Sequence, residues 1–235
     1  MKIAVLVPFY NEGENLIYFI NEWEKFLKKK KKLRRNLFFF FIDDGSIDKS
    51  ANIIRDNIKK ISYKIIKKKN SGHGDTCKYG YQLITTKYAQ YSYLLQIDSD
   101  NQCDPKYLEK FIKSAKNNYN FIFGYRNTRD DGFIRYLTSK VMALTFYLKK
   151  FIYIKDLNTP YRMMKTKFLK EIIKNINKNK NFKKIELFNC LLTYQIKIKY
   201  SIKWHDINFR NRTYGSSKFN FIKMFLMFFN FISKV

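Results

Sequence analysis

Short apolar runs alternate with longer segments of helical periodicity over the first half of the chain. A short apolar run between polar turns is typical of a buried strand, whereas apolar residues at i, i+3 and i+4 favour an amphipathic helix. The expected strands are residues 2–7, 37–42, 63–66, 93–97 and 120–123. The expected helices are residues 14–30 and 48–60, a third that begins at 72–74 and a fourth that begins at 104–105.

This repeated alternation of strand and helix predicts an α/β fold, with a doubly wound and mostly parallel sheet in a single domain. In such sheets, ligands bind outside the carboxyl ends of the strands. Polar clusters follow the expected strands at that edge, at residues 11–12, 43–44, 70–74 and 98–102. Acidic pairs held at strand ends are poorly explained by solubility alone, so the pattern predicts a binding site at this edge.

The second half of the chain has a looser pattern. We expect helices at residues 133–150, 166–175 and 186–194, one or two strands within 197–210, and a terminal helix at 219–235. The terminal helix is rich in Phe, Met and Ile but too polar and too short to span a bilayer. Such a helix can lie in the interface of a membrane; packing on the core or a dimer contact is the alternative.

The chain is strongly basic, with 47 Lys and Arg against 19 Asp and Glu in 235 residues and a formal net charge of +28. Its 46% of hydrophobic residues suffices for a core and excludes a disordered chain. The positive charge favours anionic partners such as nucleic acid, anionic lipid head groups or phosphorylated substrates. Because Lys, Asn, Ile, Phe and Tyr all have AT-rich codons, compositional bias is the alternative cause.

The cysteines and histidines restrict the kinds of site that the chain can build. Cys77, Cys103 and Cys190 form no CxxC pair, which favours reduced thiols in a cytosolic compartment. With only His73 and His205, a zinc site of several histidines is excluded, and we interpret His205 as structural. The N-terminal apolar run is too short for a signal peptide, and no run of about 20 apolar residues predicts a membrane span.

Asp98, Asp100 and Gln102 follow the fourth expected strand and are the central candidates for a metal site. Two carboxylates one residue apart at a strand end can approach one divalent cation, and the amide oxygen of Gln102 can add a third ligand. Mg²⁺ or Mn²⁺ bound there would neutralise a diphosphate leaving group. The alternative is a turn in which Asp100 or Asp104 caps the next helix.

Two further clusters are candidates for nucleotide-sugar binding. Asp43 and Asp44, at the end of the second expected strand, can accept hydrogen bonds from a base N–H or from ribose hydroxyls. The alternative there is a turn, with Asp48 as the cap of the next helix. Gly72 and His73 open a helix, where small residues let a ligand approach free backbone N–H groups.

Arg126, Arg135, Arg212 and Lys218 are the candidate catalytic cations of the second half. Fixed positive charges would stabilise a diphosphate or an anionic acceptor in the same reaction as Asp100. Glycines and serines near them favour this functional interpretation. In a chain this basic, ordinary surface positions are the alternative.

In their order along the chain, four motifs resemble those of the family 2 glycosyltransferases, which have the GT-A fold. These motifs are residues 7–12, 42–48, 70–74 and 98–102. Later segments resemble the branch of dolichyl-phosphate mannose synthase and related polyprenyl-phosphate sugar transferases; they are residues 124–126, 135–140, 156–162 and 209–218. The chain departs from that branch at Thr159-Pro160, where Ser-Gly is expected, and at Asn189 or Cys190, where many members carry a carboxylate.

The resemblance implies a catalytic domain at residues 1–218, with a nucleotide-sugar-binding half at 1–124 and an acceptor half at 125–218, followed by the apolar helix at 219–235. By resemblance, the nucleotide is held by Pro8, Tyr10, Glu12 and Asp43 or Asp44. The metal is held by Asp100 and Gln102, with Asp98 beside the ribose or the metal.

The implied reaction moves a sugar from a UDP- or GDP-sugar to an acceptor, with inversion at the anomeric centre. A hydroxyl acceptor needs a general base, whereas a phosphate is already anionic and does not. Because no base is evident, the sequence favours a polyprenyl phosphate acceptor, used by a peripheral protein on the cytoplasmic face of a membrane. Transfer to a glycan hydroxyl in cell-surface polysaccharide synthesis, an inactive relative and a homo-oligomer stay open. A basic nucleic-acid-binding module is disfavoured, because the gathered acids would repel phosphates.

Overall fold

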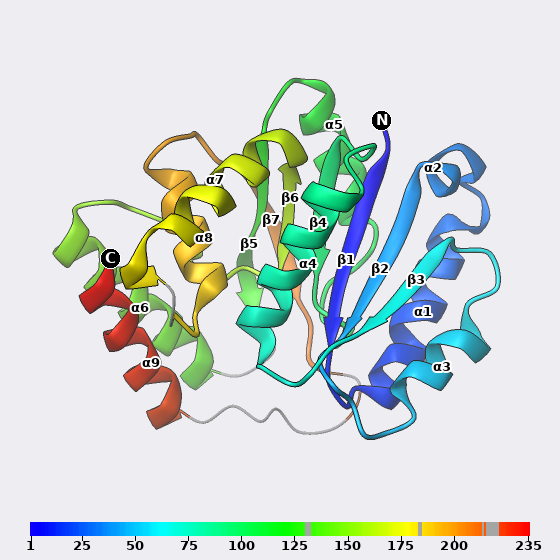
Figure 1. The fold of residues 1–235 in the computed structure, drawn as a ribbon, viewed down its shortest axis with the longest axis horizontal. Helices are drawn as coiled ribbons and strands as arrows, with labels where there is room; N and C mark the ends of the chain where they lie inside the picture. Colours follow the sequence, from blue (N-terminus) through cyan, green and yellow to red (C-terminus); the bar gives the residue numbers. More distant parts are fainter. Residues whose placement is uncertain (130–132, 183–184, 213, 215–220) are drawn as a thin grey trace.

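The computed structural model describes residues 1–129, 133–182, 185–212, 214 and 221–235. In these residues, seven strands form one sheet in the order β3-β2-β1-β4-β6-β5-β7 (Figure 1). The strands are β1 (Ile3–Phe9), β2 (Leu37–Asp43), β3 (Tyr63–Lys67), β4 (Tyr93–Ile97), β5 (Phe121–Arg129), β6 (Tyr161–Lys165) and β7 (Lys203–Phe209). The helices are α1 (Gly13–Lys28), α2 (Lys31–Arg35), α3 (Ser50–Asn57), α4 (His73–Lys87), α5 (Tyr107–Lys116), α6 (Phe133–Lys150), α7 (Thr166–Lys178), α8 (Phe188–Lys197) and α9 (Phe221–Lys234), with a short 3-10 turn at Lys180–Phe182.

The expected strands of the first half are all present, and β4 and α6 have the expected bounds. The sequence pattern does not predict β6, because Arg162 and Lys165 interrupt its apolar run. This strand pairs antiparallel with both β4 and β5, whereas the other strand pairs are parallel. The sheet is therefore mixed, and the expectation of a mostly parallel sheet is confirmed.

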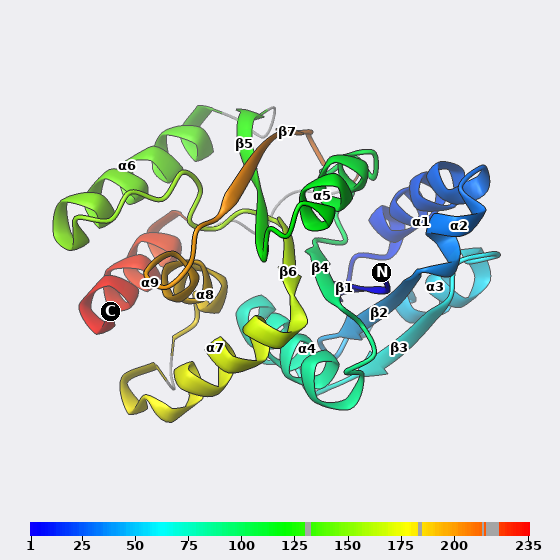
Figure 2. The same cartoon turned by 90° about the horizontal axis from the view of Figure 1, so that it is seen from above.

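Alternate residues of β1 face two layers of helices (Figure 2). Val5 and Val7 pack with residues of α1 and α5, while Leu6 packs with residues of α4 and α7 on the opposite face. Trp23 of α1 is fully buried and meets Phe39 of β2 edge to face, with ring centroids 5.1 Å apart. This packing fixes α1, and with it the segment between β1 and α1, against the sheet.

The carboxyl ends of β1, β2 and β4 meet at one edge, because these strands run parallel (Figure 1, lower edge). β1 and β2 stay in register up to the pair Phe9 and Asp43. The polar segments that follow the three strands are therefore brought together, as the sequence predicts for this edge.

α6 and α9 lie beside each other on the side of the molecule far from β3 (Figures 1 and 2). Phe146 of α6 stacks on Phe231 of α9 at 5.9 Å between ring centroids. Phe228, Phe231 and Ile232 are all buried. Of the alternatives for the terminal helix, α9 therefore adopts packing on the core; residues 219 and 220 lie outside the described residues.

Candidate active site

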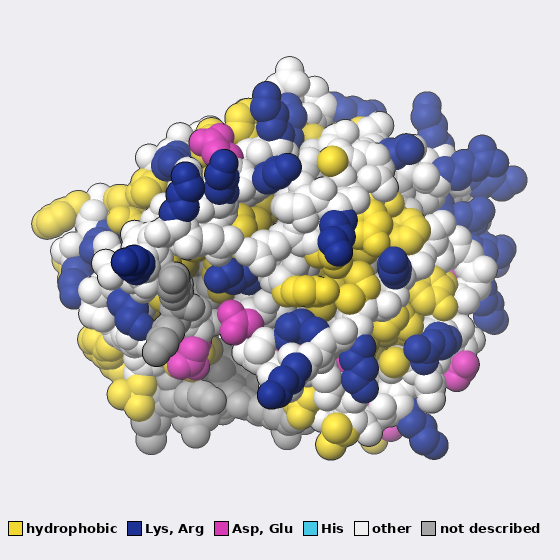
Figure 3. Space-filling view, viewed as in Figure 1, with side chains coloured by type: hydrophobic (Ala, Val, Ile, Leu, Met, Phe, Trp, Pro, Cys, Tyr) yellow, Lys and Arg dark blue, Asp and Glu magenta, His cyan; other side chains and the backbone are white. Residues whose placement is uncertain are grey.

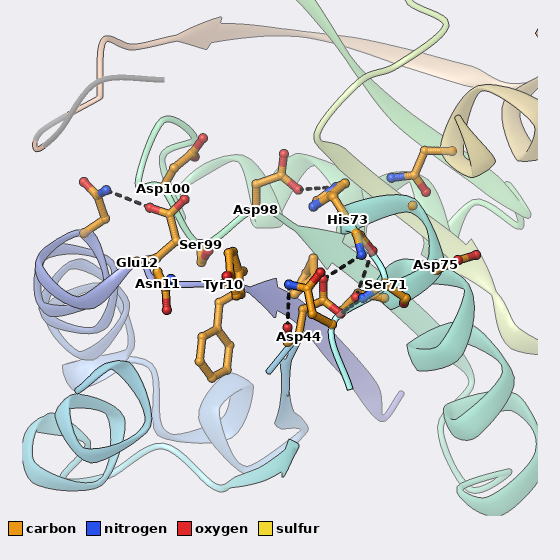
Figure 4. A pocket seen from close by; sticks show the side chains of 18 of the residues that line it. Tyr10, Asn11, Glu12, Asp44, Ser71, His73, Asp75, Asp98, Ser99 and Asp100 are labelled. Carbon is orange, nitrogen blue, oxygen red and sulfur yellow. Dashed lines mark hydrogen bonds and ion pairs between the residues drawn. The ribbon is translucent and has the colours of Figure 1, made fainter. Parts of the chain in front are cut away.

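A pocket of about 1040 Å³ opens at the carboxyl edge of the sheet. It is built by the segments that follow β1, β2, β3 and β4 (Figure 4). The predicted residues that line it are Pro8, Tyr10, Glu12, Asp44, Gly72, His73, Asp98, Asp100 and Arg212. Of the predicted site residues that the structure describes, Asp43, Gln102 and Arg126 do not line the pocket. Lys218 and the side chain of Arg135 lie outside the described part of the chain.

Asp44 holds the turn that leads into α4. Its carboxylate accepts hydrogen bonds from the backbone N–H groups of Ser71 at 2.9 Å and Gly72 at 2.8 Å, and from Lys68 Nζ at 2.6 Å. Burial opposes ionisation, but the hydrogen bonds from Lys68, Thr76 and Ser71 leave the pKa of Asp44 below its usual value. Asp44 is therefore a fixed anion whose oxygens position the start of α4.

Asp43 and Asp48 shape the turn after β2. Asp43 is buried, and its Oδ1 accepts a hydrogen bond from Ser46 N at 2.7 Å. Asp48 accepts the N–H of Ser50, the first residue of α3, at 3.0 Å, and that of Gly13 at 3.3 Å. The N-cap position of α3 is Lys49, so Asp48 stabilises the turn that leads into α3 from one residue before the predicted cap. Asp43 stabilises the turn after β2 and does not line the pocket.

α4 begins at the pocket, where two glycines allow a tight approach. Gly72 has φ 89°, a conformation that side chains other than glycine rarely adopt. At Gly74, an added Cβ would lie 2.2 Å from the backbone oxygen of Glu186. This close contact sets the first N–H groups of α4, which have no partner within the helix, against the wall of the pocket.

We expect Gly74→Ala to lower the free energy of unfolding by about 1–3 kcal/mol, because the new methyl group meets a backbone carbonyl that cannot rotate away. Urea denaturation of the variant and the wild type measures the difference. Lys87→Ala, at an exposed position in the last turn of α4, is the control and should change stability by less than about 0.5 kcal/mol. Unchanged stability of Gly74→Ala would contradict this close packing.

Asp98 and Asp100 come directly after β4 and line the pocket. Asp98 accepts a hydrogen bond from Gln96 Nε2 at 2.8 Å and lies 3.6 Å from His73 Nε2 (Figure 4). Burial and the negative charge of Asp98 raise the pKa of Asp100 to about 7, although Arg212 opposes the shift. A cation at this pair would supply the positive charge that the buried carboxylate lacks.

Gln102 connects the loop after β4 to the segment after β7. Its Nε2 donates to Arg210 O at 2.7 Å, and its backbone oxygen accepts from Arg210 N at 3.0 Å. This pairing directs the Gln102 side chain away from the pocket lining. Among the described residues, no three Asp, Glu, His or Cys side chains form a metal site by themselves. A metal here would combine Asp98 and Asp100 with oxygen ligands from a substrate or water.

Arg126 and Arg212, the predicted catalytic arginines whose side chains the structure describes, have different surroundings. Arg212 lines the pocket, with Nη2 at 3.0 Å from Glu12 Oε1 and 3.5 Å from Asp100 Oδ2. Arg126 forms a two-pronged pair with Asp156, at 2.7 and 2.8 Å. The structure therefore places a fixed cation beside the carboxylates of the pocket at Arg212, and holds Arg126 at the end of β5.

Beneath the pocket lies a buried polar network that the sequence pattern does not single out. Arg162 of β6 is fully buried and donates to Asn189 O at 3.0 Å. The Asn189 side chain accepts from Tyr81 OH at 3.0 Å and donates to Cys77 Sγ at 3.5 Å. Cys77 and Tyr81 are four residues apart on α4, a helical spacing that the sequence does reveal, but their partners are distant in the chain.

His73 connects this network with the pocket. The Cys77 sulfur, at 3.5 Å from Nε2, and the Asp98 carboxylate raise the pKa of His73 to about 10, although burial opposes the shift. The raised pKa favours the protonated imidazole, and 54% of the His73 side-chain surface is exposed. A cation at the start of a helix suits an anionic ligand such as a phosphate.

Matches to known proteins place the chain among the glycosyltransferases. It belongs to glycosyl transferase family 2, whose family model matches residues 4–188. An uncharacterized protein of Methanocaldococcus jannaschii is 30% identical over 186 residues, which cover 72% of this chain and 74% of that protein. The undecaprenyl-phosphate 4-deoxy-4-formamido-L-arabinose transferase of Photorhabdus laumondii is 23% identical over 235 residues, which cover 99% of this chain and 67% of the relative.

Solved structures confirm the expected GT-A fold. S. aureus TarS 1-349 in complex with UDP-GlcNAc matches with a TM-score of 0.65 and 16% identity, over 99% of this chain and 66% of that one. Glucosyl-3-phosphoglycerate synthase from Mycobacterium tuberculosis, in complex with Mn²⁺, UDP and glucosyl-3-phosphoglycerate, matches with a TM-score of 0.61 and 10% identity. This match covers 99% of this chain and 79% of that one. The chain thus spans between 66% and 79% of the length of these four proteins.

Proposed function

We propose that the chain transfers a sugar from a nucleotide-diphosphate sugar to the phosphate of a polyprenyl-type lipid. The observation that carries the proposal is the meeting, in one pocket, of the acidic pair Asp98 and Asp100 with the cation Arg212, His73 and the start of α4. The acidic pair suits a divalent cation, and the cationic side suits a diphosphate. Support comes from the P. laumondii relative, named for undecaprenyl phosphate, and from neighbours bound to UDP or UDP-GlcNAc.

Asp98 and Asp100 are the residues that would hold Mg²⁺ or Mn²⁺. The raised pKa of Asp100 fits this role, since the buried carboxylate gains most from an added positive charge. When bound, the cation supplies charge that stabilises the diphosphate as it leaves. Arg212 holds a second positive charge beside Asp100. The Mn²⁺ in the M. tuberculosis structure supports the choice of metal.

The nucleotide end of the donor is proposed to lie along Pro8, Tyr10 and Glu12. Tyr10 presents its ring in the pocket (Figure 4), and an aromatic face is a surface on which a base can stack. Glu12 is held in place by Arg212 at 3.0 Å and by Asn15 Nδ2 at 2.8 Å. Oriented in this way, its carboxylate can accept hydrogen bonds from a ligand without first losing conformational freedom.

The side chains near the acceptor end of the pocket bear on the choice of acceptor. Asn189 or Cys190 stands where many members of the resembled branch carry a carboxylate. The Asn189 amide, already held by Tyr81 and Cys77, cannot take a proton. This favours an acceptor that is already ionised, such as a phosphate. Asp75 and Glu186 also line the pocket, and they favour a second candidate function, transfer to a glycan hydroxyl with one of them as general base.

We also propose that transfer takes place at the cytoplasmic face of a membrane, where a polyprenyl phosphate would present its head group. In the part of the chain that the structure describes, no helix has both the length and the apolarity needed to cross a bilayer. The division of the chain into a donor half at residues 1–124 and an acceptor half at residues 125–218 remains a prediction. Family membership favours an enzyme over the nucleic-acid-binding module.

The test compares a polyprenyl phosphate with the matching polyprenol as acceptor, in the presence of Mn²⁺ and labelled UDP- or GDP-sugars. We expect label on the phosphate and none on the alcohol, because only the phosphate is nucleophilic without a base. Glu186→Gln and Asp75→Asn should then keep kcat within about threefold, since a general base contributes about 10²–10⁴-fold where one is used. Transfer to the polyprenol, or to a soluble glycan with a loss of that size in either variant, would instead support the hydroxyl acceptor.

A further inference from the structure

The outer face of α6 carries a continuous apolar stripe. Leu137, Val141, Leu144 and Leu148 are spaced four, three and four residues apart, so they lie along one face of the helix. Between 41% and 62% of the surface of each is exposed. Phe146, on the opposite face, is buried against α9. We call the four exposed residues the outer α6 stripe.

The apolar surface continues past the end of the helix. Phe151 is 83% exposed, with φ 54° and its N–H donating to Tyr147 O at 2.7 Å, and Tyr153 is also exposed. Leu226 and Phe229 are exposed on the neighbouring α9. Hydrophobic side chains can be seen along the left margin of Figure 3, the side on which Figure 1 places α6 and α9. Single exposed apolar residues are ordinary, but several along one face of a helix, as in the outer α6 stripe, mark an interaction surface.

The charges around the stripe indicate what it meets. Neither α6 nor α9 contains a single Asp or Glu, although the chain has 19 acidic residues. Lys140 and Lys149 of α6 are exposed near the stripe, and Lys140 Nζ also donates to Tyr125 OH at 3.0 Å. Two copies of this surface would bring lysines against lysines, which disfavours a symmetric dimer. An anionic lipid surface complements both the apolar stripe and the lysines.

The position of α9 connects this surface with the pocket. Met224 and Met227 of α9 line the pocket, while Phe231 of the same helix packs on Phe146 of α6. One helix therefore separates the polar pocket from α6. Because the outer α6 stripe lies on the face opposite Phe146, a bilayer against this stripe would be separated from the pocket by α6 and α9.

We propose that the outer α6 stripe docks on the surface of an anionic bilayer. The assignment rests on the lipid acceptor of the proposed function. It differs from the expectation based on residues 219–235, because α9 places Phe228, Phe231 and Ile232 in the core. In this arrangement α6 lies flat in the interface, its leucines reach the acyl chains, and its lysines face the lipid head groups.

The experiment is flotation of the full chain with vesicles of phosphatidylcholine and phosphatidylglycerol, compared with vesicles of phosphatidylcholine alone. We expect binding to the anionic vesicles, weaker binding to the neutral ones, and a loss of about tenfold or more in the partition coefficient of Leu144→Gln/Leu148→Gln. Tyr18→Gln, at an exposed aromatic position on α1, is the matched control and should bind like the wild type. Thermal melts confirm that each variant is folded.

Equal binding of the leucine variant and the wild type, or no binding of the wild type to either vesicle, would overturn the proposal. A dimer in light scattering that the leucine variant loses would assign the stripe to a second copy instead. A second assay measures sugar transfer by the wild type and the leucine variant to a short, water-soluble polyprenyl phosphate. This acceptor needs no membrane, so the assay tests the proposed function separately from the docking surface. Unchanged transfer by the leucine variant, together with lost vesicle binding, would support both proposals. Vesicle binding by a wild type that transfers no sugar would support the docking surface and refute the proposed lipid acceptor.

Discussion

Asp100→Asn is expected to lower kcat by roughly 10²–10⁴-fold, because metal stabilisation of a departing diphosphate is worth several kcal/mol. The substitution keeps the shape of the side chain and an oxygen that can accept the hydrogen bond from Gln102 N. It removes the negative charge that the metal requires, together with the charge pairing to Arg212 at 3.5 Å. The fold should therefore persist, and the free energy of unfolding should be unchanged or higher, since a carboxylate that burial disfavours is replaced by a neutral amide.

Steady-state kinetics and urea denaturation of the same preparation check both parts of this prediction. Asp104→Asn is the matched control, because Asp104 accepts the N–H of Lys106 near the start of α5 and does not line the pocket. Its kcat should stay within about threefold of the wild type. Full activity of Asp100→Asn, or of the wild type in excess EDTA, would remove Asp98 and Asp100 from the mechanism.

The raised pKa of Asp100 gives the metal site a pH dependence of known sign. Below about pH 7 the carboxylate holds a proton that a metal must displace, so the affinity for Mn²⁺ should rise with pH and level off above about pH 7. The same group makes the metal-free protein less stable as pH rises from about 4 to 7, since the folded state holds the proton more tightly than the unfolded state. Isothermal titration of Mn²⁺ at several pH values, with Asp100→Asn as reference, measures the effect.

Arg212→Ala is expected to lower kcat/KM by roughly 10²-fold, because it removes the fixed cation beside Glu12 and Asp100. Arg212→Lys should recover only part of the loss, since lysine keeps the charge but not the planar pair of donors. The repulsion between Glu12 and Asp100 would also be left uncompensated, so the pKa of Asp100 should rise further in the alanine variant. Kinetics with the donor varied at saturating acceptor measure this effect.

Arg210→Ala is the control for Arg212. Arg210 forms a two-pronged pair with Glu22 at 2.8 and 3.0 Å, and its side chain does not line the pocket. The hydrogen bonds to Gln102 use only the backbone N–H and C=O of Arg210, so they do not need the Arg210 side chain. We expect kcat/KM within about threefold of the wild type for Arg210→Ala. Similar losses in Arg210→Ala and Arg212→Ala would mean that a shift of the whole segment, rather than the charge at Arg212, causes the defect.

Local sequence patterns predict the first half of this fold well because each strand and the polar residues that follow it are close together in the sequence. The apolar runs at β1, β2 and β4 and the polar residues directly after them lie within a few positions of each other, and parallel pairing then brings their ends together. The positions of Asp44, His73, Asp98 and Asp100 in one pocket follow from that rule alone.

The remaining features depend on contacts between distant parts of the chain. β6 carries Arg162 in the middle of the sheet, and its burial is tolerated because oxygen atoms of residues 158, 159 and 189 accept its hydrogen bonds. Gln102 has a side chain suited to a metal, but its amide is bound to Arg210, 108 residues away. The apolar composition of α9 fits a membrane or a core equally well, and the contact between Phe231 and Phe146 places that face of the helix in the core.

The pair between Glu12 and Arg212 joins residues that are 200 positions apart in the chain. During synthesis at about 5–20 residues per second, the two ends of this pair would leave the ribosome some ten to forty seconds apart. The first strands and helices can pair in that interval, but their carboxylates lack the opposing arginine until β7 has been added to the sheet. A nascent or truncated chain that ends before residue 203 would therefore expose a half-built, uncompensated acidic edge. Full affinity for a diphosphate would appear only once nearly the whole chain has folded.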